Sequence, residues 1–74
     1  MKPSKSRDPR VDPLDGDELD LNGTLYKPDA PDPHFWVVFM KYPPVKNDPG
    51  VADSCSLGAW RALMKDARVL AKGE

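Results

Sequence analysis

Oxygen-bearing side chains between residues 18 and 29 have the spacing of a calcium-binding loop. They are Glu18, Asp20 and Asn22 at loop positions 1, 3 and 5, followed by Gly23 at position 6 and Asp29 at position 12. This order is similar to that of the helix–loop–helix calcium motif. Position 1 is Glu rather than Asp, Pro28 fills position 11, and no helical pattern flanks the segment. The alternating leucines inside it favour a β-hairpin, so we predict no metal site.

The only histidine, His34, and the only cysteine, Cys55, are the candidates for a catalytic nucleophile pair. Such a pair needs both side chains in contact and a third group that orients the histidine. No sequence pattern provides this, and a small buried residue is ordinary at the helix start expected near Cys55. The carboxylates of residues 12–20 resemble an acid–base pair only in composition, because the segment is expected to lack a pocket. We therefore predict a protein that is not an enzyme and binds no cofactor.

Charged residues are distributed in blocks, although the net charge is −1. Residues 1–10 and 53–74 are basic, whereas residues 11–34 are acidic. The acidic candidates for contact with a basic partner surface are Asp15, Asp17, Glu18 and Asp20. The basic candidates, which helical spacing would place in one stripe, are Arg61, Lys65 and Arg68. Such a stripe could bind phosphates, so a small nucleic-acid-binding protein that uses it together with the N-terminal arm is an alternative function.

A chain of 74 residues has room for a single small domain. Its one cysteine excludes an internal disulfide framework and fits a reducing compartment. No apolar stretch reaches the roughly 20 residues that span a bilayer, and the basic start is followed by acidic residues instead of an apolar signal core. We expect a cytoplasmic monomer that does not bind membranes.

Residues 18–27 are expected to form a hairpin. Asn22-Gly23 is a preferred pair for a two-residue type I′ turn. That turn pairs Leu19 with Tyr26 and places Glu18 opposite Lys27 as a charge pair. A proline-rich connector, residues 27–33, follows; we interpret it as a linker, with a proline-rich recognition motif as the alternative.

The apolar run from His34 to Tyr42 predicts the central strand. Alternation places Phe35, Val37 and Phe39 on one face and places Trp36, Val38, Met40 and Tyr42 on the other. The strand should end at Pro43-Pro44. A helix can cover only one of these faces, so either loops fold over the second face or it remains for a partner. Trp36 and Tyr42 are therefore further candidate contact residues.

The pattern after Pro49 is helical, with Ser54 or Ser56 as the N-cap and Gly73 as the stop. Apolar residues from Leu57 to Ala71 recur on one side. Residues 1–17 hold few large apolar side chains and are expected to form a disordered arm. The predicted fold over residues 18–74 is thus a single α+β domain: an antiparallel three-stranded sheet, made of a hairpin plus one strand, with one C-terminal amphipathic helix.

Three stretches, Met1 to Ser6, His34 to Pro44 and Ser56 to Leu70, give the whole chain a resemblance to a family of small phage-encoded transcription regulators. The family is the type that a lytic Xanthomonas phage uses to bind host RNA polymerase. The resemblance implies binding to the N-terminal part of the polymerase β′ subunit in the bacterial cytoplasm. It also implies inhibition of host initiation by weaker σ binding, and antitermination on phage genes. The expected function is therefore that of a non-enzymatic regulator.

Overall fold

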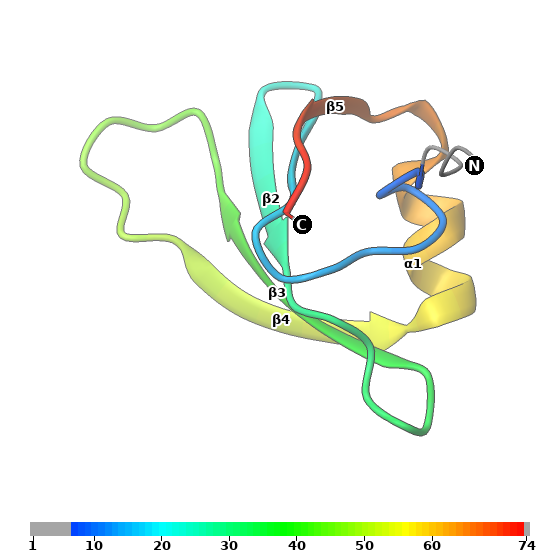
Figure 1. Ribbon diagram of the computed structural model, residues 1–74. Coiled ribbons are helices and arrows are strands. Elements are labelled where there is room, and N and C mark those ends of the chain that lie inside the picture. Colours follow the sequence, from blue (N-terminus) through cyan, green and yellow to red (C-terminus); the bar gives the residue numbers. More distant parts are fainter. Residues whose placement is uncertain (1–6, 74) are drawn as a thin grey trace.

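The computed structural model describes residues 7–73, which form a five-stranded antiparallel sheet and a short helix (Figure 1). The strands are β1 (Glu18–Leu21), β2 (Thr24–Pro28), β3 (Trp36–Tyr42), β4 (Val51–Ser56) and β5 (Arg68–Ala71). The helix α1 (Leu57–Leu63) continues into a 3-10 turn, η1 (Met64–Asp66). The strand order is β4-β3-β2-β1-β5, so four strands form a meander and β5 returns to pair with β1. The α+β class is confirmed, but the sheet is larger than the three strands predicted from the sequence.

The hairpin of β1 and β2 has the predicted turn and register. Asn22 and Gly23 have φ values of 54° and 92°, as a type I′ turn requires. Leu19 pairs with Tyr26, and the Glu18 carboxylate lies 4.0 Å from Lys27 Nζ. Glu18 and Asp20 share one face of β1, but each lies beside a basic side chain, Lys27 and Arg68 respectively, instead of facing a common centre as in a calcium loop.

Strand β3 buries one of the two faces that its alternation defines and exposes the other. Val37 and Phe39 are buried, whereas Trp36 and Val38 are exposed. The expectation for Phe35 is wrong, because this residue precedes the strand with a φ of 60° and its side chain is 67% exposed. A turn on Asp32 holds it there, since the N–H of Phe35 donates to the Asp32 carbonyl at 2.9 Å.

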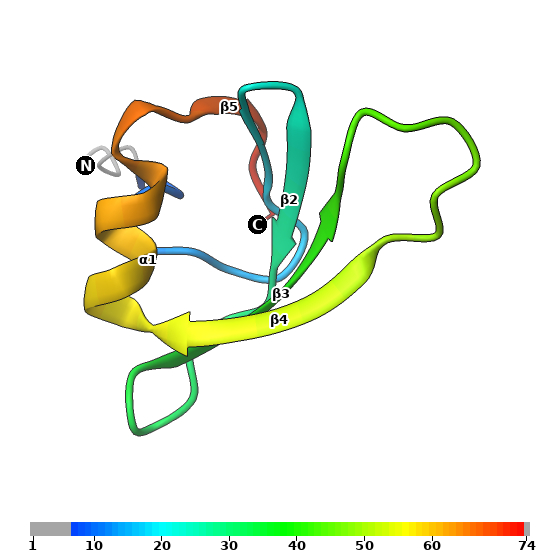
Figure 2. The same ribbon diagram turned by 180° about the vertical axis from the view of Figure 1, so that it is seen from behind.

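Strand β4 occupies residues expected to form a turn and a helix start. It pairs with β3 over its whole length, from Trp36↔Ser56 to Lys41↔Val51. The loop of residues 43–50 reverses the chain, and Gly50 has the positive φ of 88° expected after Pro49. Figure 2 shows this loop projecting away from α1 on the far side of the sheet. The strand is stabilised by its neighbour, because most of its residues are small or polar and have low intrinsic strand preference.

The helix is shorter than predicted, and its C-terminal half is replaced by β5. Of the two candidate N-caps, Ser56 caps the helix by accepting the N–H of Ala59 at 3.1 Å. After η1 the chain becomes extended at Ala67, with φ −75° and ψ 153°. β5 then pairs with β1, which supplies backbone partners for an edge that would otherwise be open. Within residues 7–73, no helix is long and apolar enough to cross a membrane.

The hydrophobic core lies between the sheet and α1. Its buried residues are Leu19, Tyr26, Val37, Phe39, Trp60, Met64 and Ala67. Trp60 of α1 contacts the rings of Phe39 and Tyr26, with centroid distances of 5.2 and 6.2 Å. The inclined and edge-on geometries of these rings are the favourable arrangements for aromatic pairs.

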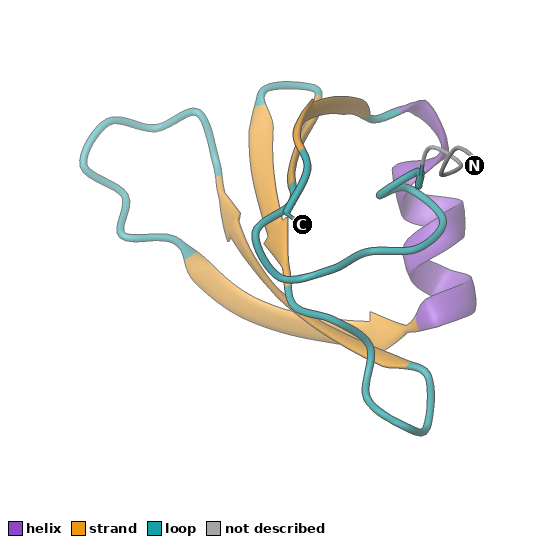
Figure 3. Cartoon of the chain, viewed as in Figure 1, coloured by secondary structure: helices purple, strands orange, loops and turns teal. Residues whose placement is uncertain are grey.

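The expectation of a disordered arm is wrong for residues 7–17, and residues 1–6 lie outside the described part of the chain. The segment passes α1 on its way to β1 (Figure 3). Pro9 and Pro13 are fully buried. The Pro9 carbonyl accepts the buried Trp60 Nε1–H at 3.0 Å. Specific hydrogen bonds and buried prolines therefore order a segment whose composition predicts disorder.

Candidate partner-binding surface

The sheet face opposite α1, here called the outer face, exposes apolar side chains. β3 contributes Trp36, Val38, Met40 and Tyr42 to it by alternation. Trp36 is 46% exposed and Val38 47% exposed, although both belong to a central strand. Phe35 adds an exposed ring immediately before the strand. Neighbouring exposed apolar groups of this size are typical of interaction sites rather than of scattered surface residues.

Charged pairs border the outer face on the side of β1 and β2. Lys27 lies 5.6 Å from the ring centroid of Tyr42 and 4.0 Å from the Glu18 carboxylate. Asp20 on β1 lies 3.9 Å from Arg68 on β5. These are long contacts between partly exposed groups, which contribute little to stability. The charges therefore remain available to a partner.

A shallow acidic hollow of about 290 Å³ adjoins this face. Asp15, Glu18 and Asp29 line it, with Lys27 and Met40 beside them. Asp15 and Asp29 come from segments on either side of the hairpin, so the hollow depends on the ordered residues before β1. Clustered carboxylates next to an apolar surface are complementary to a basic, partly apolar partner.

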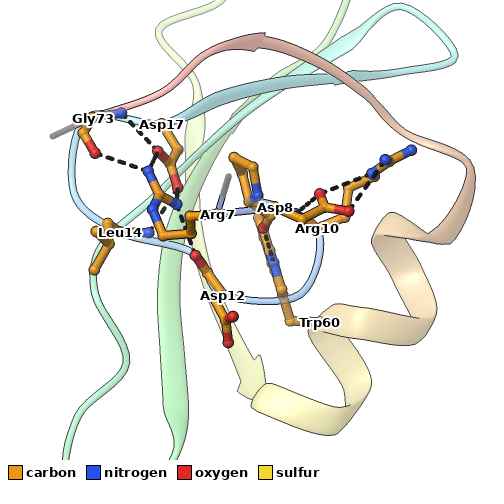
Figure 4. Close-up of polar contacts among 9 residues, drawn as sticks. Arg7, Asp8, Arg10, Asp12, Leu14, Asp17, Trp60 and Gly73 are labelled. Atoms are coloured by element: carbon orange, nitrogen blue, oxygen red, sulfur yellow. Dashed lines mark hydrogen bonds and ion pairs between the residues drawn. The ribbon is translucent and has the colours of Figure 1, made fainter. Parts of the chain in front are cut away.

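Asp17 also borders the hollow, but its side chain is buried and not available to a partner. It is 1% exposed and forms the centre of a cluster with Arg7, Leu14 and Gly73, here called the Asp17 cluster (Figure 4). The Arg7 guanidinium donates to both carboxylate oxygens at 2.7 Å, and the N–H groups of Leu14 and Gly73 donate at 2.7 Å. Arg7 also donates to the Gly73 carbonyl at 2.8 Å.

Burial alone would raise the pKa of Asp17, since it penalises the charged carboxylate. The hydrogen bonds from Arg7, Leu14 and Gly73, together with the charge of Arg7, outweigh burial and hold the pKa below its usual value. Asp17 therefore stays ionised and fastens the segment before β1 to the end of β5. Its function is structural.

The three basic candidates do not form one stripe. Arg61 on α1 donates from Nε to the Val11 carbonyl at 2.9 Å and lies 3.5 Å from Asp12. Lys65 lies on η1, whereas Arg68 lies on β5 beside Asp20. The stripe predicted from helical spacing is wrong, because the helix ends before its last members.

The nucleophile candidates gain no activation from the fold. Cys55 lies on β4 opposite Val37, and His34 lies in the turn before β3. Burial raises the pKa of the Cys55 thiol, and the nearby charge of Asp53 raises it further. Both effects disfavour the thiolate, which is the nucleophilic form. Among residues 7–73 there is no group of three or more His, Cys, Asp or Glu side chains that could hold a metal ion.

The structure thus gathers most of the sequence candidates at one surface and leaves others out. Those on or beside the outer face are Asp15, Glu18, Asp20, Trp36, Tyr42 and Arg68. Asp29 lines the hollow and Phe35 is exposed next to β3, but neither was among the candidates. The available signals were a carboxylate after Pro28 and a turn that follows Pro33. No protein-family model matches the chain, and no curated protein or solved structure shows significant similarity to it.

Proposed function

We propose that the protein is a non-enzymatic regulator that binds bacterial RNA polymerase through its outer face. The observation that carries the binding role is the exposed apolar patch of Phe35, Trp36 and Val38. Burying large aromatic side chains is the main source of affinity in protein interfaces. A small domain gains nothing in stability from leaving such side chains exposed, so the patch favours a partner.

The identity of the partner rests on the resemblance to small phage-encoded transcription regulators. Two of the stretches that support the resemblance are now assigned to elements: residues 34–44 contain β3, and residues 56–70 contain α1 and most of β5. The proposed target is the N-terminal part of the polymerase β′ subunit. Binding there would weaken σ binding, inhibit initiation at host promoters and allow antitermination on phage genes.

Charge supports a basic contact region on the partner. Asp15, Glu18 and Asp29 would face it from the acidic hollow. Complementary charges at the edge of an interface mainly increase the association rate, and salt screens them. Association should therefore slow as ionic strength rises, while the apolar patch maintains the dissociation rate.

The test is binding of purified bacterial RNA polymerase to the immobilised protein. Trp36→Ala should weaken binding by about tenfold or more, as expected for an aromatic anchor. Leu63→Ala is the matched control, because Leu63 is an exposed apolar residue of α1 and lies outside the outer face. Absence of polymerase binding by the wild type at low salt would overturn the proposal. Promoter-initiation and terminator read-through assays then measure the two proposed effects.

The alternative is a small nucleic-acid-binding protein that uses Arg61, Lys65 and Arg68. It has weaker support because Arg61 and Arg68 each lie within 4 Å of a carboxylate. A mobility-shift assay with duplex and single-stranded DNA distinguishes the two functions. A shift whose strength falls steeply with salt would favour the alternative, since phosphate binding releases counterions.

A further inference from the structure

Among residues 7–73, β4 forms one edge of the sheet, and its outward side presents backbone groups at regular spacing. Two hydrogen bonds made by the neighbouring strand β3 establish which way the β4 groups point. The N–H of Asp29 donates to the Val38 carbonyl at 2.8 Å, and the N–H of Asp32 donates to the Trp36 carbonyl at 3.0 Å. The backbone groups of Trp36 and Val38 therefore point toward the β2 side. In an antiparallel ladder both groups of a residue point the same way.

The backbone N–H and C=O groups of the β4 residues paired with Trp36 and Val38 must then point away from β3. These partners are Ser56 and Ser54, and Ala52 follows at the same period of two. The side-chain contacts agree, because the N–H of Ser54 donates to the Asp53 carboxylate at 2.8 Å instead of to β3. β4 is also the longer of the two edge strands, with six residues against four in β5.

We propose that this edge pairs with an extended segment of a partner protein, which adds a strand next to β4. A strand pairing with Ala52, Ser54 and Ser56 would gain main-chain hydrogen bonds, as in other cases of strand addition. The inference rests on the proposed function for the partner's identity, bacterial RNA polymerase. It adds how the partner is held.

The side chains around the edge define the chemistry of that segment. Ala52, Ser54 and Ser56 are small and share the outer face with Trp36 and Val38. Large apolar side chains at alternate positions of the added strand can therefore lean across β4 and cover Trp36 and Val38. This contact would bury the patch that the isolated domain leaves exposed.

Asp53 determines which charge the added segment of the partner should carry. Its carboxylate holds the Ser54 N–H and lies 3.3 Å from Lys41 Nζ. When the Ser54 N–H pairs with a partner carbonyl, the half-exposed carboxylate is released and can pair with a Lys or Arg of the added strand. In the free protein the same carboxylate blocks the edge, a common protection against self-pairing. A second copy is a poorer occupant, because it would bring its own Asp53 to a neighbouring position on the same face.

The test compares Ser54→Pro with Ser54→Ala. Proline removes the outward N–H without removing a ladder hydrogen bond to β3, whereas alanine keeps the N–H and removes only the hydroxyl. We expect Ser54→Pro to bind polymerase at least tenfold more weakly and Ser54→Ala to stay within twofold of the wild type. In wild-type protein, hydrogen exchange of the Ala52 and Ser54 amides should slow on binding, a readout that requires no variant.

Two outcomes separate this inference from the proposed function. If the polymerase binds wild type and Ser54→Pro equally and leaves both amides unprotected, the edge inference is overturned and the proposed function stands. If the polymerase does not bind, the proposed function fails. A synthetic octapeptide of alternating valine and lysine then tests strand addition at the β4 edge on its own. If the peptide slows hydrogen exchange of the Ala52 and Ser54 amides, the edge inference is supported; if it does not, the inference is overturned. A dimer in sedimentation that Ser54→Pro abolishes would assign the edge to a second copy and also overturn the inference.

Discussion

Replacing Asp17 with Asn tests the role of the Asp17 cluster in stability. The wild-type carboxylate accepts four hydrogen bonds, two from Arg7 and one each from the N–H groups of Leu14 and Gly73. An Asn side chain has the same shape but offers one acceptor oxygen, and its NH₂ group must face donors. The variant therefore removes the counter-charge that Asp17 gives the part-buried Arg7 guanidinium, and it leaves at least one N–H without an acceptor.

The expected cost is large for a domain of this size. Removing one partner of a buried ion pair typically costs about 3–5 kcal/mol. Small domains have a free energy of unfolding at the low end of the usual range of roughly 5–15 kcal/mol. A loss of about 3 kcal/mol would lower the melting temperature by roughly 12–24 °C, at about 4–8 °C per kcal/mol.

Thermal and urea unfolding followed by circular dichroism measure this loss. Glu18→Gln is the matched control, because it removes a carboxylate from an exposed pair with a 4.0 Å separation. Pairs of that kind contribute less than about 1 kcal/mol. The Arg7→Ala and Asp17→Ala double-mutant cycle should give a coupling energy well above that value. Equal stability of Asp17→Asn and Glu18→Gln would refute the structural role of Asp17.

The pH dependence provides an independent check on the same cluster. Because the folded state holds the pKa of Asp17 below its usual value, the ionised carboxylate stabilises the fold above that usual value. This stabilisation is lost as the pH falls through the lower, folded-state pKa. Wild type should therefore lose more stability between about pH 5 and pH 2 than Asp17→Asn does. Parallel pH profiles would contradict the assignment.

Three further predictions concern other positions. Gly73→Ala should destabilise the fold by several kcal/mol, because a Cβ there would overlap the backbone of residues 15 and 16. Gly58→Ala is the control: there is open space around it in α1, so it should be neutral or stabilising by up to about 1 kcal/mol in the same thermal melts. Phe35→Asn should raise the free energy of unfolding by about 1 kcal/mol, since Asn tolerates the positive φ better. The same variant should bind polymerase more weakly. If both stability and polymerase affinity rise, Phe35 is not part of the interface. Trp60→Phe should cost about 1–3 kcal/mol by leaving the buried Pro9 carbonyl without its donor, and unchanged chemical denaturation would refute this.

Local signals in the sequence predicted local structure correctly. The Asn22-Gly23 turn determines the hairpin and its register, because both central residues adopt the positive φ that this turn needs. The alternation in β3 likewise predicted that Val37 and Phe39 share one face and that Trp36 and Val38 share the other. Each of these features depends on residues close together in the chain.

The missed features depend on distant partners. β4 is a strand because β3 pairs with it, since residues such as Asp53 and Ser54 have little strand preference of their own. In β5 the apolar spacing continues the helical period, but pairing with β1 overrides it. The ordered segment before β1 is held by contacts to Trp60 and Gly73, more than fifty residues away in sequence. Composition cannot reveal such contacts, so both the acidic hollow and the free edge of β4 were inaccessible to sequence patterns.

The Asp17 cluster also affects how the chain folds during synthesis. The Asp17 carboxylate can accept the N–H of Gly73 only after 56 further residues have been synthesised. At about 5–20 residues per second, the ribosome needs roughly 3–11 s to add those residues. During that interval β1 has no β5 beside it and exposes an unpaired strand edge. Glu18 and Asp20 keep this edge charged, so we expect the carboxylates beside the outer face to disfavour aggregation of the nascent chain as well.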